Sequence, residues 1–358
     1  MNYNQYRRHT VQVMTGHIAI GGNAPLSVQS MTNTDPHNFD ATFKQVLSLQ
    51  EAGCDIIRLT VPDKEAARVI AKIKDSGKCT VPLVADIHFD YRVVLDSLDA
   101  GVDKIRINPG NIGDKDRVHT VAKACREKKV PIRIGVNSGS LEKEILSKYG
   151  SPTPEALAES ALYHARLLEE WDFNDIVISI KSSSVQNMVA ANRIVAERCQ
   201  YPLHIGITES GTISTGLIKS AAGIGALLCD GIGDTIRVSL TADPLVEVET
   251  GKQILSALGL GAPSVNVISC PSCGRTKINL FDTVERFEQY AKTLHPKSNI
   301  TVAIMGCAVN GPGEAREADI GIAGGIGEYL LFRRGEIICK VKADQAFDVL
   351  VQETQKLL

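Results

Sequence analysis

The sequence has few aromatic residues, no marked excess of charge and no long apolar run. Aromatic residues make up 5% of its 358 residues, with a single tryptophan, and 39 lysines and arginines stand against 41 aspartates and glutamates. This near-neutral balance gives no general electrostatic reason to expect binding to a nucleic acid or a membrane surface. No apolar run reaches the roughly 18 residues that a membrane-spanning helix needs, and the longest candidate, around 221–229, is interrupted by glycine.

An export signal and a disulfide framework are also not expected. The arginines near the N-terminus are not followed by an apolar core, which predicts a cytoplasmic protein without a secretion signal. The nine cysteines are odd in number, and disulfides are rare in the cytoplasm. Five cysteines lie in apolar or helical stretches, where a thiol usually packs as a small hydrophobic group: Cys54, Cys79, Cys125, Cys199 and Cys229. The other four all follow residue 265, and this asymmetry is the first indication of function.

From residue 26 to about 238 the sequence alternates short β-branched runs with amphipathic helical patterns, such as 40–52, 64–76, 155–171 and 185–199. The predicted strands are 26–31, 55–61, 81–86, 104–107, 132–136, 175–180, 203–208 and 235–238. Strands that alternate with helices indicate parallel βαβ units, and eight of them match a (β/α)8 TIM-type barrel, an α/β fold. A doubly wound open sheet is the alternative. Such a sheet more often carries a glycine fingerprint after its first strand, whereas GHIAIGG at 16–22 precedes that strand.

The alternation stops near 259–263 (GLGAP), which has the composition of a linker. We therefore predict a barrel domain at 1–258 that binds the substrate and a second domain at 259–358. The second domain should be a small α+β unit with strands at 265–269, 300–305, about 319–322 and about 337–341 and helices at 282–293 and 343–357.

Four predicted strands carry an arginine between apolar residues: Arg58, Arg106, Arg133 and Arg237. A buried guanidinium without a partner is very costly, and a single one would be interpreted as half of a structural ion pair. Four at equivalent strand positions instead favour a ring of bidentate donors at the barrel mouth, which would suit phosphate. Lys181, at the end of the sixth strand, could join this ring.

Further polar residues stand just after the predicted strands, where barrel enzymes have their active sites. Asn108 opens the loop NPGNIG, whose backbone N–H groups could cradle an anion, and Asn137 follows the fifth strand. Asp86 and His88 close the third strand. Ion pairing with an arginine and proton transfer are equally good interpretations of Asp86.

Glu209 closes the seventh strand among small neighbours. This position favours a catalytic role in proton transfer. His204 lies early in the same strand, and we expect it to be structural.

The second domain contains a metal-binding pattern. Cys270 and Cys273 form a C-x2-C pair, which is common for two thiolates on one metal. Cys307 follows 34 residues later, and Glu314 stands seven residues beyond it across a Gly-Pro-Gly turn. Structural zinc normally requires four Cys or His ligands, a set that Cys339 could complete. Iron–sulfur clusters are also held by thiolates, and three cysteines with one oxygen ligand favour a cluster over zinc. We expect Cys339 to pack in a core.

The phrases SVQSMTNTD, PLVADIHFD, RINPGNIG, IRIGVNSGSL, GITESGT, GIGDTIRVSLTADP, SCPSCGR and MGCAVNGPGEA run through nearly the whole chain. Together they closely resemble the bacterial 4-hydroxy-3-methylbut-2-en-1-yl diphosphate synthase family in its shorter, two-domain form. The resemblance implies an oxidoreductase of the non-mevalonate isoprenoid pathway. Its substrate would be 2-C-methyl-D-erythritol 2,4-cyclodiphosphate, which is opened reductively and dehydrated to the linear allylic diphosphate.

The resemblance also implies a cofactor and partners. A [4Fe–4S] cluster would be bound by Cys270, Cys273, Cys307 and Glu314, and reduced flavodoxin or ferredoxin would deliver electrons singly. The chain would form a homodimer in which the barrel of one subunit faces the cluster domain of the other. The diphosphate would be clamped by Arg58, Arg106, Arg133 and Lys181 with Asn108 and Asn137 nearby, next to Asp86 and His88, and Glu209 would supply a proton.

Two other interpretations remain at this point. A zinc-stapled barrel enzyme could act on a phosphorylated sugar by aldol or isomerase chemistry. A nucleic-acid binder could use the C-terminal motif as a zinc ribbon, although the near-neutral charge argues against it.

Overall fold

The computed structural model describes residues 5–112, 115–308, 313 and 315–358. The chain divides into two compact units, Met1–Leu258 and Gly259–Leu358. No helix in the described part is long and apolar enough to cross a membrane.

Parallel strands of the first unit form one sheet in the order β8-β7-β6-β5-β4-β3-β10-β9. A bridge between Ile178 and Leu203 links its two ends, so the sheet curves into the predicted barrel, which is confirmed. The strands are β3 (Ser27–Met31), β4 (Ile56–Thr60), β5 (Leu83–Asp86), β6 (Lys104–Ile107), β7 (Ile132–Asn137), β8 (Ile176–Lys181), β9 (His204–Ile205) and β10 (Thr235–Ile236). Each falls within or next to a predicted strand, although β9 and β10 are shorter than expected.

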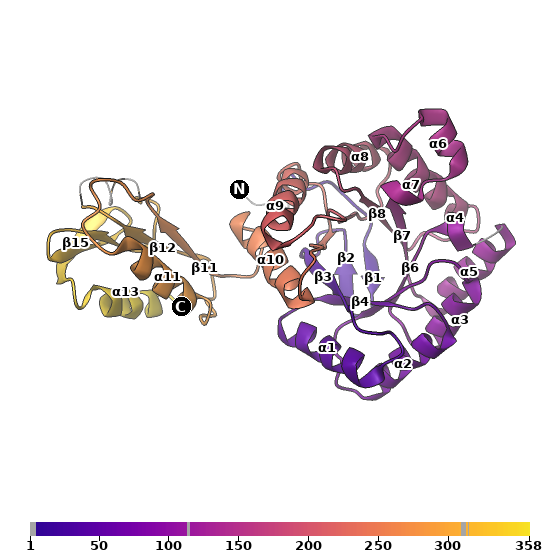
Figure 1. Cartoon of the computed structure of the whole chain (residues 1–358), viewed down its shortest axis with the longest axis horizontal. Helices are drawn as coiled ribbons and strands as arrows, with labels where there is room; N and C mark the ends of the chain where they lie inside the picture. Colours follow the sequence, from indigo (N-terminus) through magenta and orange to yellow (C-terminus); the bar gives the residue numbers. More distant parts are fainter. Residues whose placement is uncertain (1–4, 113–114, 309–312, 314) are drawn as a thin grey trace. The chain divides into compact units, whose positions relative to one another are not determined.

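Helices surround these strands (Figure 1). Many of them begin at an Asn, Asp, Ser or Thr whose side chain accepts a hydrogen bond from a first-turn backbone N–H, as Asp63 does from Ala66. Such caps satisfy amide groups that have no partner within the helix. The helices are α1 (Phe39–Glu51), α2 (Lys64–Asp75), α3 (Tyr91–Asp99), α4 (Pro109–Ile112), α5 (Lys115–Lys128), α6 (Lys143–Tyr149), α7 (Pro154–Glu169), α8 (Val185–Arg198), α9 (Ile213–Cys229) and α10 (Pro244–Ala257), with a 3-10 turn at Ser138–Ser140.

A short antiparallel hairpin, β1 (Val13–Thr15) and β2 (Ile18–Ile20), precedes the barrel and was not predicted. Val13 and Ile20 pack against Ile56, Val84 and Val177. Because Ile56 and Val177 stand at or near the first residues of their strands, the hairpin closes the amino-terminal end of the barrel. The carboxyl ends of the strands are therefore the end left for a site.

The second unit is built on a five-stranded sheet in the order β11-β12-β13-β14-β15. β11 (Val265–Ser269), β12 (Ile300–Met305) and β13 (Ile320–Gly324) are parallel, and β14 (Glu328–Arg333) and β15 (Glu336–Lys342) continue the sheet in antiparallel fashion. The helices α11 (Leu280–Ala291) and α13 (Ala346–Gln355) contribute Phe287 and Leu350 to a core shared with Val302 and Ile322.

One strand of this unit was not predicted, and one prediction was wrong. β14 was not predicted, because glycines and charged residues on both sides of it are typical of a loop. Cys339 was expected in a core, but it is exposed on β15. β15 is the edge strand of the sheet and residues 336–340 are all exposed, so an apolar sequence there does not lead to burial.

Candidate functional site

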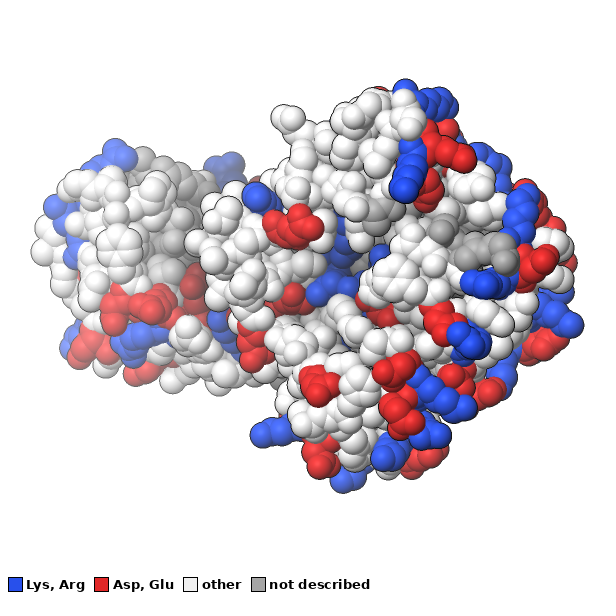
Figure 2. Space-filling view, turned by 45° about the vertical axis from the view of Figure 1, so that its right-hand side comes forward, with Lys and Arg blue, Asp and Glu red and all other residues white. Residues whose placement is uncertain are grey.

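Five basic side chains of the barrel strands lie close to one another: Arg58, Arg106, Arg133, Lys181 and Arg237. Lys181 ends β8 and Arg237 directly follows β10, whereas Arg133 stands near the start of β7. Arg58, Arg106, Arg133 and Lys181 are buried, and the Arg237 side chain is 15% exposed. Figure 2 shows basic atoms at the bottom of a hollow in the molecular surface. We call these five residues the basic cluster. The structure therefore brings the four predicted arginines and Lys181 near one another, although Arg133 does not lie at the carboxyl end of its strand.

One strand glycine makes room for this cluster. A Cβ atom at Gly135 on β7 would lie 2.3 Å from Nε of Arg106. Gly206, just after β9, makes room for the neighbouring backbone instead, because a Cβ atom there would lie 2.2 Å from the carbonyl oxygen of Arg237. Any side chain at Gly135 would therefore displace the Arg106 guanidinium. Sequence reasoning missed both residues, although a glycine inside a strand, such as Gly135, is a known sign of close approach by another group.

Asp86 is the carboxylate partner within the cluster. Its Oδ1 lies 3.0 Å from Nη1 of Arg106, and its Oδ2 lies 3.7 Å from Nε of Arg58. Burial acts to raise the pKa of Asp86, but the charges of Arg58 and Arg106 outweigh it and lower the pKa to about 2. Asp86 is thus ionised and paired at neutral pH, which favours the ion-pair interpretation over proton transfer.

Arg106 is held in a fixed orientation by several partners. In addition to Asp86, its Nη1 lies 3.1 Å from Nε2 of the exposed His88, and its Nη2 donates to the carbonyl oxygen of Gly135 at 3.2 Å. Arg58 is oriented differently, because Nε and Nη2 lie 3.0 and 2.8 Å from Sδ of Met31. Met31 is a second neighbour that the sequence did not reveal.

The cluster holds more positive charge than its carboxylates balance. Burial, followed by repulsion from neighbouring cations, lowers the pKa of both Arg133 and Lys181 well below their ordinary values. Among the described residues, Nζ of Lys181 and Nε and Nη2 of Arg133 have no hydrogen-bond partner. Buried donors of this kind are costly unless a ligand satisfies them. An anion with several oxygens would balance the excess positive charge and would accept hydrogen bonds from these donors.

Two asparagines border the cluster. Asn108 is buried directly after β6, and Asn137 ends β7 opposite Lys181 in the sheet register. The predicted anion-binding glycine loop that starts at Asn108 extends to residue 113, which lies outside the described residues. The two amides are therefore placed beside the basic cluster, whereas the loop as a whole is not described.

Glu209 lies in the loop after β9 and is exposed. Its φ of 53° is in the left-handed region, which costs a residue other than glycine about 1–3 kcal/mol and persists only where surrounding contacts impose it. The next residue supplies one such contact, because the Ser210 hydroxyl donates to the carbonyl oxygen of Ser239. Strain of this kind often occurs at functional sites.

A layer of buried polar groups was not predicted. Lys104 at the start of β6, Gln29 on β3 and His204 on β9 are all fully or almost fully buried. Burial and the nearby cations, Arg133 first among them, lower the pKa of His204 well below its ordinary value, so this imidazole is neutral. The interior of this barrel is therefore polar where a packed barrel usually places branched apolar side chains.

Two cysteines of the second unit, Cys270 and Cys307, follow the carboxyl ends of neighbouring strands. Cys270 directly follows β11, and Cys307 follows β12 after one intervening residue. Since these two strands are parallel neighbours, both cysteines come after carboxyl ends at the same edge. The backbone N–H of Gly306 donates to Sγ of Cys270 at 3.1 Å, and N–H groups directed at sulfur are among the factors that tune thiolate-bound iron–sulfur centres.

Cys273 is exposed in the loop between β11 and α11. Hydrogen bonds from the backbone and side chain of Arg275 lower the pKa of the Cys273 thiol, which favours its thiolate. Thr276 closes the turn, since its N–H donates to the Cys273 carbonyl oxygen at 3.0 Å.

All nine cysteines are free, so the thiols are available as ligands. Three soft thiolate donors fit an iron–sulfur cluster in chemistry. Within the described part of the chain, however, no three Cys, His, Asp or Glu side chains are already grouped as a metal site. Glu314, the predicted fourth ligand, lies outside the described residues.

Comparison with known families gives a clear match over both units. The model of the GcpE TIM-barrel domain matches residues 10–252, and that of the GcpE protein C-terminal domain matches residues 266–356. The chain belongs to the GcpE family. Relatives named 4-hydroxy-3-methylbut-2-en-1-yl diphosphate synthase (flavodoxin) include one from Ruminiclostridium cellulolyticum, 56% identical over 98% of both chains. Another, from Clostridium perfringens, is 56% identical over 97% of this chain and 98% of its own. The resemblance noted in the sequence is thus confirmed.

Comparison with solved structures finds a common fold over part of the chain. A phospho-2-dehydro-3-deoxyheptonate aldolase of Thermotoga maritima superposes with a TM-score of 0.52 at 13% identity, over 71% of this chain and 75% of its own. A truncated 3-deoxy-D-arabino-heptulosonate 7-phosphate synthase from the same organism gives 0.51 at 13% identity, over 72% of this chain and 98% of its own. At this identity the likeness shows a common fold and nothing about chemistry.

Proposed function

We propose that this chain reductively opens 2-C-methyl-D-erythritol 2,4-cyclodiphosphate and dehydrates it to 4-hydroxy-3-methylbut-2-en-1-yl diphosphate. The observation that supports this most strongly is the combination of a buried basic cluster with unsatisfied donors and three free cysteines in the second unit, two of which follow neighbouring parallel strands. The names of full-length relatives give the same product and flavodoxin as their donor. The reaction belongs to the synthesis of isoprenoid precursors.

The basic cluster would bind the diphosphate. Arg133 and Lys181 carry buried donors without partners, and phosphate oxygens would accept from them in a site that excludes water. Asp86 and His88 contact Nη1 of Arg106. This guanidinium would therefore already be oriented when the substrate binds. Such preorganisation reduces the entropy lost on binding. Asn108 and Asn137 add neutral donors for ester or hydroxyl oxygens.

Cys270, Cys273, Cys307 and Glu314 would hold a [4Fe–4S] cluster. When bound, this cluster supplies electrons one at a time. The lowered pKa of Cys273 and the N–H bond to Cys270 favour the thiolate form that iron requires.

The overall change consumes two electrons and one proton. The bond between a ring carbon and a phosphate oxygen breaks, the neighbouring hydroxyl leaves as water, and a carbon–carbon double bond forms. A hydroxyl leaves readily only when it is protonated, so a positioned acid is needed. Glu209, held in a strained conformation at the carboxyl end of the barrel, would deliver this proton.

The partners follow from the same proposal. Reduced flavodoxin, or ferredoxin, would supply the electrons. The active site would be completed in a homodimer, with the barrel of one subunit facing the cluster domain of its partner. We also propose a cytoplasmic location, because nine free cysteines suit a reducing compartment.

Anaerobic purification and reconstitution test this proposal. The protein should be brown, with an absorbance that dithionite bleaches, and it should convert the cyclic diphosphate when a reductant is present. A colourless protein that holds one tightly bound zinc ion and shows no redox signal would contradict it and would favour the zinc-stapled barrel.

A further inference from the structure

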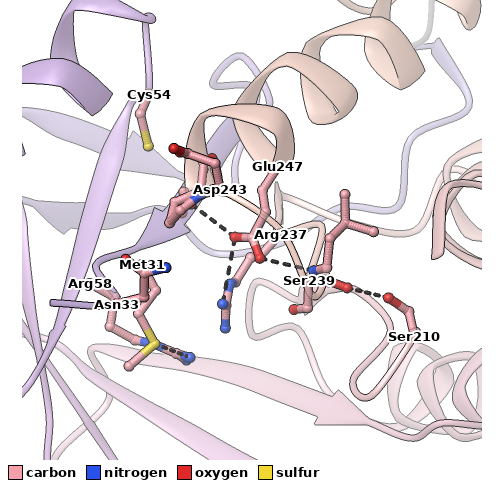
Figure 3. A network of polar contacts seen from close by, with 12 residues as sticks. Met31, Asn33, Cys54, Arg58, Ser210, Arg237, Ser239, Asp243 and Glu247 are labelled. Carbon is pink, nitrogen blue, oxygen red and sulfur yellow. Dashed lines mark hydrogen bonds and ion pairs between the residues drawn. The ribbon is translucent and has the colours of Figure 1, made fainter. Parts of the chain in front are cut away.

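Glu247 is a buried carboxylate that belongs neither to the basic cluster nor to the cysteine motif. It lies in the first turn of α10 and is 4% exposed. Its Oε1 accepts a hydrogen bond from the backbone N–H of Leu240 at 2.9 Å, and its Oε2 accepts one from the Ser30 hydroxyl at 3.0 Å. The same Oε2 lies 3.6 Å from Nη2 of Arg237. Figure 3 shows the Glu247 carboxylate directed at Arg237 and at the chain around Ser239.

The first consequence concerns Arg237. The positive charge of Arg237 lowers the pKa of both Arg58 and Lys181, whereas the negative charge of Glu247 raises it. Without the Glu247 carboxylate, these cations would still repel the Arg237 guanidinium, which would have lost the carboxylate oxygen that lies 3.6 Å from it. Glu247 therefore holds in place one of the basic cluster's guanidinium groups.

The second consequence concerns the loop after β10. The N–H of Leu240 is held by Glu247, and the residues on either side of Leu240 are bonded to the loop after β9. The carbonyl oxygen of Ser239 accepts from the Ser210 hydroxyl, and the N–H of Thr241 donates to the carbonyl oxygen of Gly211 at 3.0 Å. We call this pair of contacts the loop latch.

The loop latch lies directly beside Glu209. Ser210 and Gly211 are the next two residues, and Glu209 itself has a φ of 53°. A strained backbone conformation is kept only when its surroundings impose it. The packing at Gly216 supports the same conclusion, because a Cβ atom there would lie 2.4 Å from Leu240 and 2.9 Å from the Ser210 hydroxyl. The two loops are thus closely fitted to one another around α9.

We propose that Glu247 is a positioning residue for the reaction, which orients Arg237 through charge and Glu209 through Leu240 and the loop latch. This inference rests on the function proposed above. Glu247 would not touch the substrate. Its two oxygens separate the two effects, because one faces the Leu240 N–H and the other faces Arg237 and Ser30.

Three variants of the cluster-loaded protein test the two effects separately. Glu247→Gln keeps an oxygen for Leu240 but loses the charge, so KM for the cyclic diphosphate should rise about tenfold while kcat changes little. Ser210→Ala breaks one contact of the loop latch and leaves Arg237 alone, so kcat should fall about tenfold with KM unchanged. Glu247→Ala should show both effects. Glu249→Gln, an exposed acid on the same helix, is the matched control and should behave as wild type.

The pH profile of kcat gives a readout that a purely structural role would not change. Glu247→Ala and Ser210→Ala should shift the limb that reports the catalytic acid, and Glu247→Gln should not. Calorimetric titration of the cyclic diphosphate should show the Glu247→Gln loss of affinity without turnover. If Glu247→Ala does not fold, Glu247→Gln and Ser210→Ala carry the test.

The outcomes separate this inference from the proposed function. If wild-type protein is active and the Glu247 and Ser210 variants only melt at lower temperature, with kcat, KM and pH profile unchanged, Glu247 is structural and the inference is wrong. If loaded wild-type protein does not convert the cyclic diphosphate, the proposed function itself fails.

Discussion

Asp86 and Arg106 face each other on neighbouring strands of the barrel, with Oδ1 of the aspartate 3.0 Å from Nη1 of the arginine. Arg106 also opposes Arg133 on its other side. One carboxylate thus stands within a group of buried cations, and it sets both the orientation of a substrate-binding group and the stability of the folded barrel.

Asp86→Asn should weaken both substrate binding and the stability of the folded barrel. Breaking a buried ion pair from one side leaves uncompensated charge and costs about 3–5 kcal/mol. The folded-state pKa of Asp86 is lowered to about 2 from an ordinary 3.8. Its stabilisation is therefore present above pH 3.8 and is lost as the pH falls toward 2. Chemical unfolding from pH 3 to pH 7 should show a difference from wild type that grows with pH. Asp99→Asn, which breaks an exposed pair with Lys128, should show almost none.

Lys181→Met should change stability and function in opposite directions. The unpartnered Lys181 ammonium destabilises the substrate-free fold, so its removal should raise the melting temperature while substrate affinity falls about a hundredfold. Because the folded-state pKa of Lys181 is lowered, the unfolded chain binds more protons, and wild-type stability should rise with pH toward 10.5. That slope should be smaller in Lys181→Met. Lys123→Met, on an exposed position of α5, is the control. A lower melting temperature for Lys181→Met would show that the Lys181 ammonium does not destabilise the substrate-free fold.

Gly135→Ala should reduce substrate binding without unfolding the barrel. The new methyl group would meet the Arg106 guanidinium, which is the end of a long side chain and can move away. KM should rise about tenfold, since a bidentate donor is then misplaced. Gly225→Ala on α9, where an added Cβ meets no atom within 4 Å, should leave KM unchanged and slightly stabilise the helix. Equal KM values for the two variants would show that Arg106 does not bind substrate.

Glu209 can be tested by two substitutions with different effects on stability. Glu209→Gln keeps the strained backbone and should retain the cluster and substrate affinity, while turnover falls at least about a hundredfold. Glu209→Gly should lose turnover equally but unfold at higher denaturant concentration, because glycine adopts a positive φ without strain. Lys129→Gly, at another residue with positive φ, should gain stability and keep full turnover. Unchanged turnover in Glu209→Gln would remove this residue from the mechanism.

The sequence predicted the parts of the structure that depend on local pattern. The alternation of strands and helices predicted the barrel. The C-x2-C pair with Cys307 predicted a set of ligands, of which the structure places Cys270 and Cys307 after neighbouring strands. Contacts between distant segments carry no local signal. Glu247 lies among valines in a helix, and only the fold brings it to Arg237 and Leu240. Cys339 was predicted to be buried because it lies in an apolar run. Such a run is buried only when another element covers it, and none covers Cys339 among the described residues.

The proposed function requires one chain to combine a diphosphate-binding barrel with a cluster that delivers electrons in single steps. The most direct test is an anaerobic assay of the reconstituted protein with a measured amount of reduced flavodoxin, in which phosphorus NMR counts the linear diphosphate formed. Two electrons should be consumed for each 4-hydroxy-3-methylbut-2-en-1-yl diphosphate, and Cys307→Ser should abolish product while the substrate still binds. Loss of the cyclic diphosphate without electron consumption, or undiminished product from Cys307→Ser, would contradict the claim.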